Sequence, residues 1–143
     1  MALILCIETA TTVCSVAIAK EGEVISCVEQ NQANIHASAL TVFIHQALEE
    51  SNISLKELDA IAISKGPGSY TGLRIGVSTA KGLCYALDKP LIAVNTLEAM
   101  TYGLKSFSNS QIFKFSNCRI NKFILRFLQG LSPIIFELQQ QIP

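Results

Sequence analysis

The chain of 143 residues has no tryptophan, only four prolines and few charged residues, 15% against 50% hydrophobic. That balance excludes an intrinsically disordered chain, because disorder needs low hydrophobicity. The formal net charge is zero, so the whole chain offers no electrostatic basis for binding nucleic acid or a membrane surface. No uncharged apolar run approaches the roughly 20 residues of a membrane span. The N-terminal apolar run is broken by Glu8 and lacks the basic region of a signal peptide.

Several chemical signatures are also missing. The five cysteines form no CxxC pair and their number is odd, which favours a reducing, cytoplasmic setting over a disulfide framework. His36 and His45 are too far apart to ligate one metal ion from the same face of a helix. Neither GxGxxG nor GxxxxGK[ST] occurs, and no Ser-His-Asp or Cys-His set is visible. The sequence therefore predicts no metal site, no cofactor and no catalytic residue.

The apolar periodicity predicts the element order βββαβαβα. The first three strands are joined by short turns, as in an antiparallel meander, and the later βαβα alternation implies parallel strands with right-handed crossovers. The fold class is thus α/β, with a mixed five-stranded sheet. The predicted strands are 3–8, 13–19, 23–30, 58–64 and 91–95, and the predicted helices are 36–51 capped by Asn34, 71–87, and a last helix capped by Thr96.

The most informative segment runs from Ser64 to Gly76, SKGPGSYTGLRIG. A buried strand ends there in a Gly-Pro-Gly turn that leads directly into a helix carrying Gly72 and Gly76. Each helical glycine costs about 1 kcal/mol relative to alanine, so close packing must offset that cost. We expect another backbone to lie against the Gly72/Gly76 face, where a Cβ could not fit. The segment is either a joint within the fold or a docking surface.

Three features near this segment each have two interpretations. The turn Gly66-Pro67-Gly68, with Ser69 after it, either tightens the strand-to-helix connection or contacts a phosphate at the helix N-terminus. Glu8 ends the first strand and either caps its own Thr-rich turn or holds metal and phosphate, as an acidic residue does there in actin-like ATPases. Arg74 is either a solvated residue paired with an acid or half of an ion pair across a partner interface.

The composition changes after Leu104. Residues 1–104 carry six Lys/Arg and ten Asp/Glu, a balance of −4, whereas residues 105–143 carry five and one, a balance of +4. Six of the seven phenylalanines lie in this tail. It is either a genuine C-terminal helix or sequence not selected to follow this domain, such as a frame-shifted or truncated product, and the composition favours the second. The tail has an apolar stripe at helical spacing, Ile120, Phe123, Ile124, Phe127, Leu128 and Leu131.

Four segments closely resemble the bacterial TsaB (YeaZ) family. They are ILCIETATTVCSVAIAKEGEV, NIHASAL, AISKGPGSYTGLRIGVSTAKGLCYAL and PLIAVNTLEAM. The resemblance covers residues 2–104 and implies an N-terminal lobe, residues 1–104, with the actin-like, RNase H-like (ASKHA) fold. Family members continue into a second lobe, which residues 105–143 do not resemble, so the resemblance implies that this chain lacks the second lobe.

The resemblance implies a non-catalytic subunit that docks and activates a TsaD-like partner. With a TsaE-like ATPase, the complex makes N6-threonylcarbamoyladenosine in tRNA, so this chain would meet tRNA only indirectly. TsaD holds its metal through a pair of histidines, and at the matching NIHASAL this sequence offers only His36. The label "glycoprotease-like" that the family often carries finds no support in these residues.

In this family two helices of the N-terminal lobe form the interface with TsaD, or a homodimer interface without it. They correspond to residues 34–51 and 69–87 here. Two alternatives remain beside this scaffold. One is a nucleotide-binding hydrolase that uses Glu8 and the Gly66–Gly68 turn, and the other is a non-functional truncated fragment. The residues expected at the partner interface are His36, Leu40, Gly72, Leu73, Arg74 and Gly76.

Overall fold

The computed structural model describes residues 2–31 and 36–104, and the side chains of 2–31 and 38–100. The predicted element order is confirmed. The helices are α1 (His36–Ser51), the short 3-10 helix η1 (Leu55–Glu57), α2 (Tyr70–Leu87) and α3 (Thr96–Leu104). The strands are β1 (Leu3–Glu8), β2 (Val13–Lys20), β3 (Glu23–Asn31), β4 (Ala60–Ser64) and β5 (Leu91–Val94).

The five strands form one mixed sheet in the order β3-β2-β1-β4-β5. The first three strands are antiparallel neighbours, as expected of a meander, and β4 and β5 join parallel to β1 and to each other. The β2–β3 turn at Glu21 and Gly22 has positive φ at both residues, which suits the right-handed twist of a tight hairpin. The predicted α/β class with a mixed sheet is therefore confirmed.

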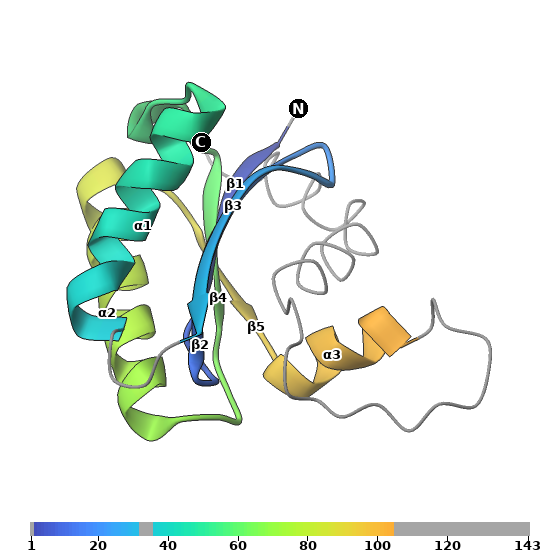
Figure 1. The fold of residues 1–143 in the computed structure, drawn as a ribbon. Helices are drawn as coiled ribbons and strands as arrows, with labels where there is room; N and C mark the ends of the chain where they lie inside the picture. The colour runs from blue at the N-terminus through green and yellow to red at the C-terminus, as the bar shows by residue number, and fades with distance from the viewer. Residues whose placement is uncertain (1, 32–35, 105–143) are drawn as a thin grey trace.

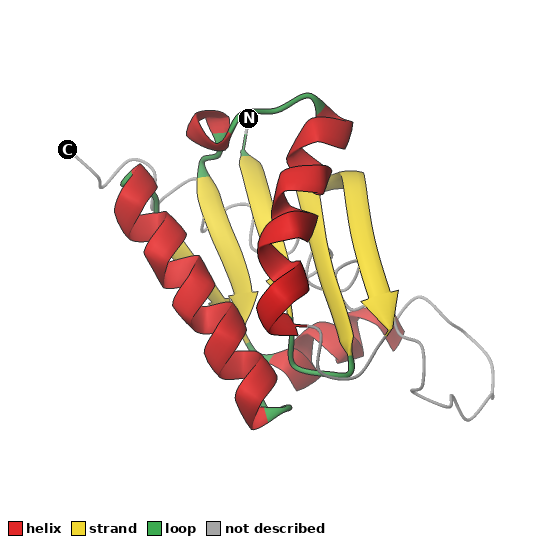
Figure 2. Ribbon diagram, turned by 60° about the vertical axis from the view of Figure 1, so that its left-hand side comes forward, coloured by secondary structure: helices red, strands yellow, loops and turns green. Residues whose placement is uncertain are grey.

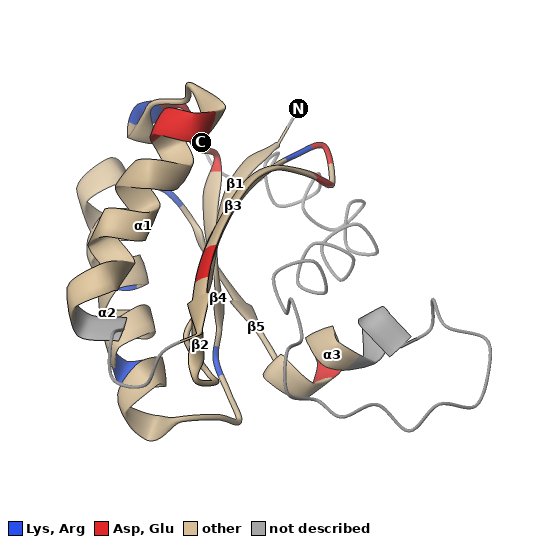
Figure 3. Ribbon diagram, viewed as in Figure 1, with Lys and Arg blue, Asp and Glu red and all other residues tan. Residues whose placement is uncertain are grey.

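Helices α1 and α2 lie side by side on one face of the sheet, and α3 lies on the other (Figures 1 and 2). Side chains alternate between the two faces along each strand, and the two faces differ in size. Charged residues are few along the elements and lie mainly near their ends (Figure 3). The face under α1 and α2 carries large side chains, Leu5, Ile7, Val16, Ile18, Ile61 and Ile63. The opposite face carries mostly small ones, Cys6, Ala17, Ala19, Ala60 and Ala62, beside Ile4.

One predicted strand begins later in the structure than expected, and one predicted helix cap lies outside the described residues. The strand expected from Leu58 begins at Ala60, because Leu58 is the C-cap of η1 and Asp59 forms hydrogen bonds with Leu3. The Asp59 carboxylate accepts a hydrogen bond from Leu3 N at 2.7 Å, and Asp59 N donates to Leu3 O at 2.8 Å. The first helix begins at His36 as predicted, but its expected cap, Asn34, lies outside the described residues.

The cap of the last helix is Asn95 and not Thr96. Asn95 Oδ1 accepts hydrogen bonds from Leu97 N at 3.0 Å and Glu98 N at 3.1 Å, which satisfies two of the free amides at the helix start. Thr96 is the first helical residue, and its amide donates to Gly66 O at 2.9 Å. The prediction missed this because both residue types cap helices well.

Within residues 2–31 and 36–104, no helix is long and apolar enough to cross a bilayer. The predicted boundary near residue 104 falls where the described part ends, so both interpretations of the tail, residues 105–143, concern residues outside it.

Candidate functional site

The glycine face of α2 packs against the turn between β1 and β2. A Cβ on Gly72 would collide with the carbonyl oxygen of Thr9, and a Cβ on Gly76 would collide with the Thr9 hydroxyl and meet Ile63 Cδ1 at 3.0 Å. The expectation of a backbone against this face is therefore confirmed at Gly72. The occupant belongs to the same chain, so the segment is a joint within the fold.

Three of the expected interface residues consequently lie inside the lobe. Gly72 and Gly76 are buried against Thr9, and Leu40 is 1% exposed in the core between α1 and the sheet. None of these three offers a surface to a partner without disrupting the fold, which corrects their assignment to an interface. The other three are Leu73, which is half-buried with its Cδ1 close to Gly66, Arg74, which is exposed, and His36, whose side chain lies outside the described part.

The outer face of α2 carries an exposed stripe opposite the glycines, formed by Tyr70, Arg74, Lys81 and Tyr85. At 3.6 residues per turn these four positions fall within about 60° of one another around the helix. Tyr70 is 74% exposed and Tyr85 is 93% exposed. Burying such large aromatic side chains would contribute substantial apolar area to an interface. We call these four residues the outer stripe of α2.

Arg74 reaches back along this stripe to Tyr70. Its guanidinium lies over the tyrosine ring, 5.4 Å from the ring centroid, and Nη1 donates to the Tyr70 hydroxyl at 3.3 Å. No carboxylate lies within ion-pair distance of Arg74 among the described residues. Among those residues, His45 and Glu49 of α1 form an ion pair with each other. The charge of Arg74 therefore points outward without an acidic partner in that part of the chain.

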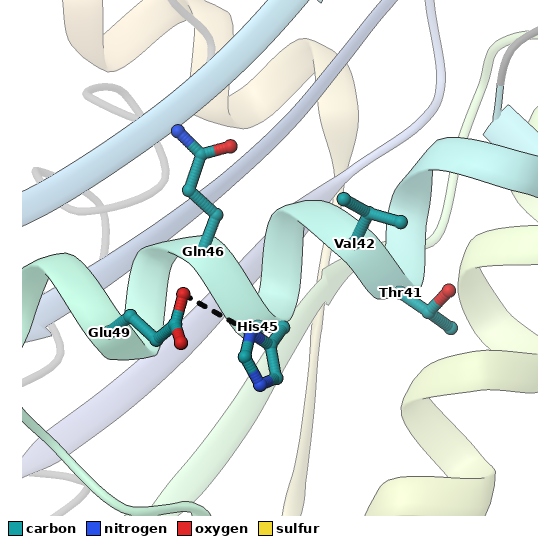
Figure 4. A pocket seen from close by; sticks show the side chains of 5 residues that line it. All are labelled: Thr41, Val42, His45, Gln46 and Glu49. Carbon is teal, nitrogen blue, oxygen red and sulfur yellow. Dashed lines mark ion pairs between the residues drawn. The ribbon is translucent and has the colours of Figure 1, made fainter.

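The outer side of α1 continues this surface. An open hollow there is lined by Thr41, Val42, His45, Gln46 and Glu49 (Figure 4). His45 Nδ1 lies 3.3 Å from Glu49 Oε2, and Val42 is 59% exposed. Because α1 and α2 lie side by side on the same face of the sheet (Figure 2), the two helices present one outer layer.

Glu8 is held inside the fold. It is 1% exposed. Oε1 accepts a hydrogen bond from Ala10 N at 2.5 Å, and Oε2 accepts one from the hydroxyl of Ser64 on β4. Burial raises the pKa of the Glu8 carboxyl, and these hydrogen bonds partly counter that rise. The carboxylate therefore closes its own turn and ties β1 to β4, with both oxygens engaged.

The Gly66–Ser69 turn is likewise occupied by its own chain. Gly66 has a φ of 109°, a conformation that favours glycine, and its carbonyl accepts the amide of Thr96. Ser69 N donates to Ala10 O at 2.7 Å, and the Ser69 hydroxyl caps α2 by accepting Gly72 N at 3.3 Å. These contacts support the interpretation of a tightened strand-to-helix connection.

Thr9 is the residue that the sequence did not single out. It is fully buried and contacts both glycines. The signal available in the sequence was indirect, since two helical glycines need a partner that approaches closely. The pattern cannot say which segment supplies that partner. Within the described part of the chain, no group of three or more His, Cys, Asp and Glu is placed to hold a metal ion.

Comparison with known proteins gives consistent matches. A model of the family TsaD, tRNA N6-adenosine threonylcarbamoyltransferase, matches residues 23–113. The tRNA threonylcarbamoyladenosine biosynthesis protein TsaB of Escherichia coli is 39% identical, over 70% of this chain and 43% of that protein. The chain belongs to the family that this model describes, as a TsaB/YeaZ member. TsaB of Bacillus subtilis is 31% identical, over 98% of this chain and 59% of that protein.

The solved structure of YeaZ from Pseudomonas aeruginosa superposes with a TM-score of 0.70 at 33% identity, covering 74% of this chain and 49% of that one. The resemblance to TsaB and the predicted α/β fold with a mixed five-stranded sheet are confirmed. This TsaB/YeaZ chain spans about half the length of the relatives that it matches.

Proposed function

We propose that this chain is a non-catalytic subunit in the biosynthesis of N6-threonylcarbamoyladenosine in tRNA, and that it docks a TsaD-type partner through the outer faces of α1 and α2. Its relatives are named tRNA threonylcarbamoyladenosine biosynthesis protein TsaB, and the matching family is named for the transferase TsaD. A TsaE-like ATPase completes the complex, and tRNA is bound by the partners.

The observation that carries this proposal is the outer stripe of α2. Tyr70 and Tyr85 are exposed large side chains, and Arg74 is held by Tyr70 with its charge turned outward. Tyrosine and arginine are the residue types that most often dominate the free energy of a protein interface. Fixing Arg74 against a ring lowers the side-chain entropy lost when a partner carboxylate binds it.

The geometry gives less support to a nucleotide hydrolase. That alternative needs Glu8 and the Gly66–Gly68 turn to face a phosphate, whereas both Glu8 oxygens and the polar groups beside the turn are bound within the chain. We expect a calorimetric titration of the chain with millimolar MgATP to give no binding heat. A saturable heat that Glu8→Gln abolishes would favour the hydrolase.

Docking is tested with a TsaD-type protein from the same organism. Arg74→Glu and Tyr85→Ala each remove a central contact of the outer stripe, and we expect the dissociation constant to rise by about 30-fold or more for each. Leu97→Ala is the matched control, because Leu97 is 56% exposed on α3, on the opposite side of the sheet. Unchanged binding by both stripe variants would refute the assigned face.

The non-catalytic role is tested in the reconstituted modification of tRNA with TsaD-type and TsaE-like proteins. At low concentrations the Arg74→Glu variant is expected to give a lower modification rate than the parent chain. Once the variant is concentrated enough to saturate the TsaD-type partner, the rate should equal that of the parent. A scaffold loses only affinity, whereas a residue that contacts the reacting atoms lowers the rate at saturation. A rate deficit that persists at saturation would contradict the proposal.

A further inference from the structure

The outer stripe of α2 carries two positive charges in one row. Arg74 and Lys81 are both exposed, and they lie seven residues apart on the helix. Seven residues advance a helix by about 10 Å and leave the second side chain about 20° from the first around the axis. The two cations therefore lie one behind the other along the outside of α2, two helical turns apart.

No carboxylate of the described residues neutralises this row. The helix itself contains no Asp or Glu, and neither cation forms an ion pair in the described part of the chain. The acids of the neighbouring helix α1 are engaged with other groups. Glu49 Oε2 lies 3.3 Å from His45 Nδ1. Glu50 accepts hydrogen bonds from the Ser26 hydroxyl at 3.0 Å and from Gln46 Nε2 at 2.8 Å.

The two tyrosines of the stripe flank the cations. Tyr70 precedes Arg74 by one helical turn and Tyr85 follows Lys81 by one turn, so the charges lie between two exposed rings. Side chains buried around the centre of an interface exclude water from it, and charges interact more strongly where water is excluded. A cation buried there without an opposite charge would oppose binding. A partner that covers the stripe must therefore bring a negative charge to each cation.

We propose that the partner segment that covers the outer stripe of α2 is a helix with two carboxylates seven residues apart. The inference rests on the proposed docking through α1 and α2, and it names the chemistry of the partner at that face. A row that drifts by about 20° in seven residues is followed by a second helix that crosses the first at about 20°. Carboxylates seven residues apart on that helix stand about 10 Å from each other, so each one meets one cation.

RNA and a second copy of this chain fit the row less well. Binding to a phosphate backbone grows with the number of phosphates that Lys and Arg neutralise, and this row has only two cations. Residues 1–104 carry a balance of −4, and Asp88 caps the end of the same helix. A second copy would bring the carboxylates of its own α1, which already have partners.

Carbodiimide crosslinking tests the inference in the complex of the full chain with a TsaD-type protein from the same organism. The carbodiimide activates a carboxylate, the neutral amine of Lys81 attacks it, and an amide bond forms while the reagent leaves as a urea that carries the carboxylate oxygen. We expect Lys81 to be joined to one Asp or Glu of the partner. Arg74→Lys supplies a second amine and should add a crosslink to an acid seven residues from the first.

Mass spectrometry of the digested complex identifies both acids. Lys20, which is exposed at the end of β2, is the reference amine and should form no crosslink to the partner. A complex that forms without a crosslink from Lys81, or with two acids at another spacing, would overturn the inference and leave the proposed docking intact. The absence of any complex would refute the docking and this inference together.

Binding at different salt concentrations provides a second test. Lys81→Gln should raise the dissociation constant by about 5-fold or more at low salt and should weaken the dependence of binding on salt. Lys20→Gln removes the same charge outside the stripe and should change neither. If Lys81→Gln weakens the binding of tRNA to the chain and leaves the affinity for the TsaD-type protein unchanged, the row contacts phosphate and the inference is wrong.

Discussion

At the scale of single residues, Thr9 explains two glycines that lie far from it in the sequence. Its carbonyl lies against Gly72, and its buried hydroxyl lies against Gly76. Each glycine weakens α2 as an isolated helix. In return, the β1–β2 turn can approach α2 more closely than any side chain at these positions would allow. The contact packs α2 against the turn that follows Glu8 at the end of β1.

Gly76→Ala and Gly82→Ala test this role of the glycines. A Cβ at position 76 would meet the Thr9 side chain and Ile63, whereas a Cβ at position 82 would meet nothing within 4 Å. We expect Gly76→Ala to lower the free energy of unfolding by about 1–3 kcal/mol, and Gly82→Ala to raise it by about 0.5–1 kcal/mol. Urea unfolding measures both. Equal stability of the two variants would show that the contact with Thr9 is not tight.

Glu8→Gln tests the buried carboxyl. Because burial raises the pKa of Glu8, the folded chain keeps this proton to a higher pH than the unfolded chain does. The resulting stabilisation is complete below the usual value of 4.5 and is lost as the pH rises through the raised pKa. Glutamine does not titrate, so the stability of Glu8→Gln relative to the parent should increase from pH 4.5 to pH 8.

Urea unfolding across that pH range measures the effect, and Glu49→Gln is its control. Glu49 lies on the outside of α1 with its side chain 69% exposed, so its neutralisation should change stability little over the range. A difference between Glu8→Gln and the parent that stays constant with pH would mean that the carboxyl does not change its proton affinity on folding.

At the scale of elements, two neighbouring polar residues at the start of α3, Asn95 and Thr96, have different roles. Asn95→Ala removes the acceptor of two amides and should cost about 1 kcal/mol of stability. The Thr96 hydroxyl is buried and makes no hydrogen bond within the described residues. Thr96→Val keeps its shape and should be neutral or stabilising. Thermal unfolding of both variants checks this, and a larger loss in Thr96→Val would restore Thr96 as the cap.

Local patterns were sufficient to predict the elements. Helical spacing predicted the full extent of α1, 36–51, and the Gly-Pro-Gly turn predicted the start of α2 to within one residue. The side of α2 that meets its own chain could not be predicted, because the partner of Gly72 and Gly76 is a turn more than sixty residues earlier. For the same reason the prediction assigned Leu40 to an interface, whereas the apolar stripe of α1 that contains Leu40 faces the core.

At the scale of the whole molecule, the two sides of the sheet have separate tasks. In the proposed function the α1 and α2 layer offers its outer stripe to a partner, whereas the opposite face carries the small side chains that pack with α3. Since the described strands β3 and β5 form the edges of the sheet, neither task uses an edge. A change on one side should therefore leave the other side intact, and their effects on stability and binding should add.

The outer stripe of α2 also predicts that the homodimer and the complex with a TsaD-type partner exclude each other. Both would bury Tyr70, Arg74 and Tyr85, and one surface cannot serve two partners. We expect light scattering after size-exclusion chromatography to show a dimer of the chain at high concentration, and its conversion to a one-to-one complex as the partner is added. Arg74→Glu should weaken both assemblies, while Leu97→Ala should weaken neither. A stable complex of two copies of this chain with one partner would show that the two interfaces lie on different faces.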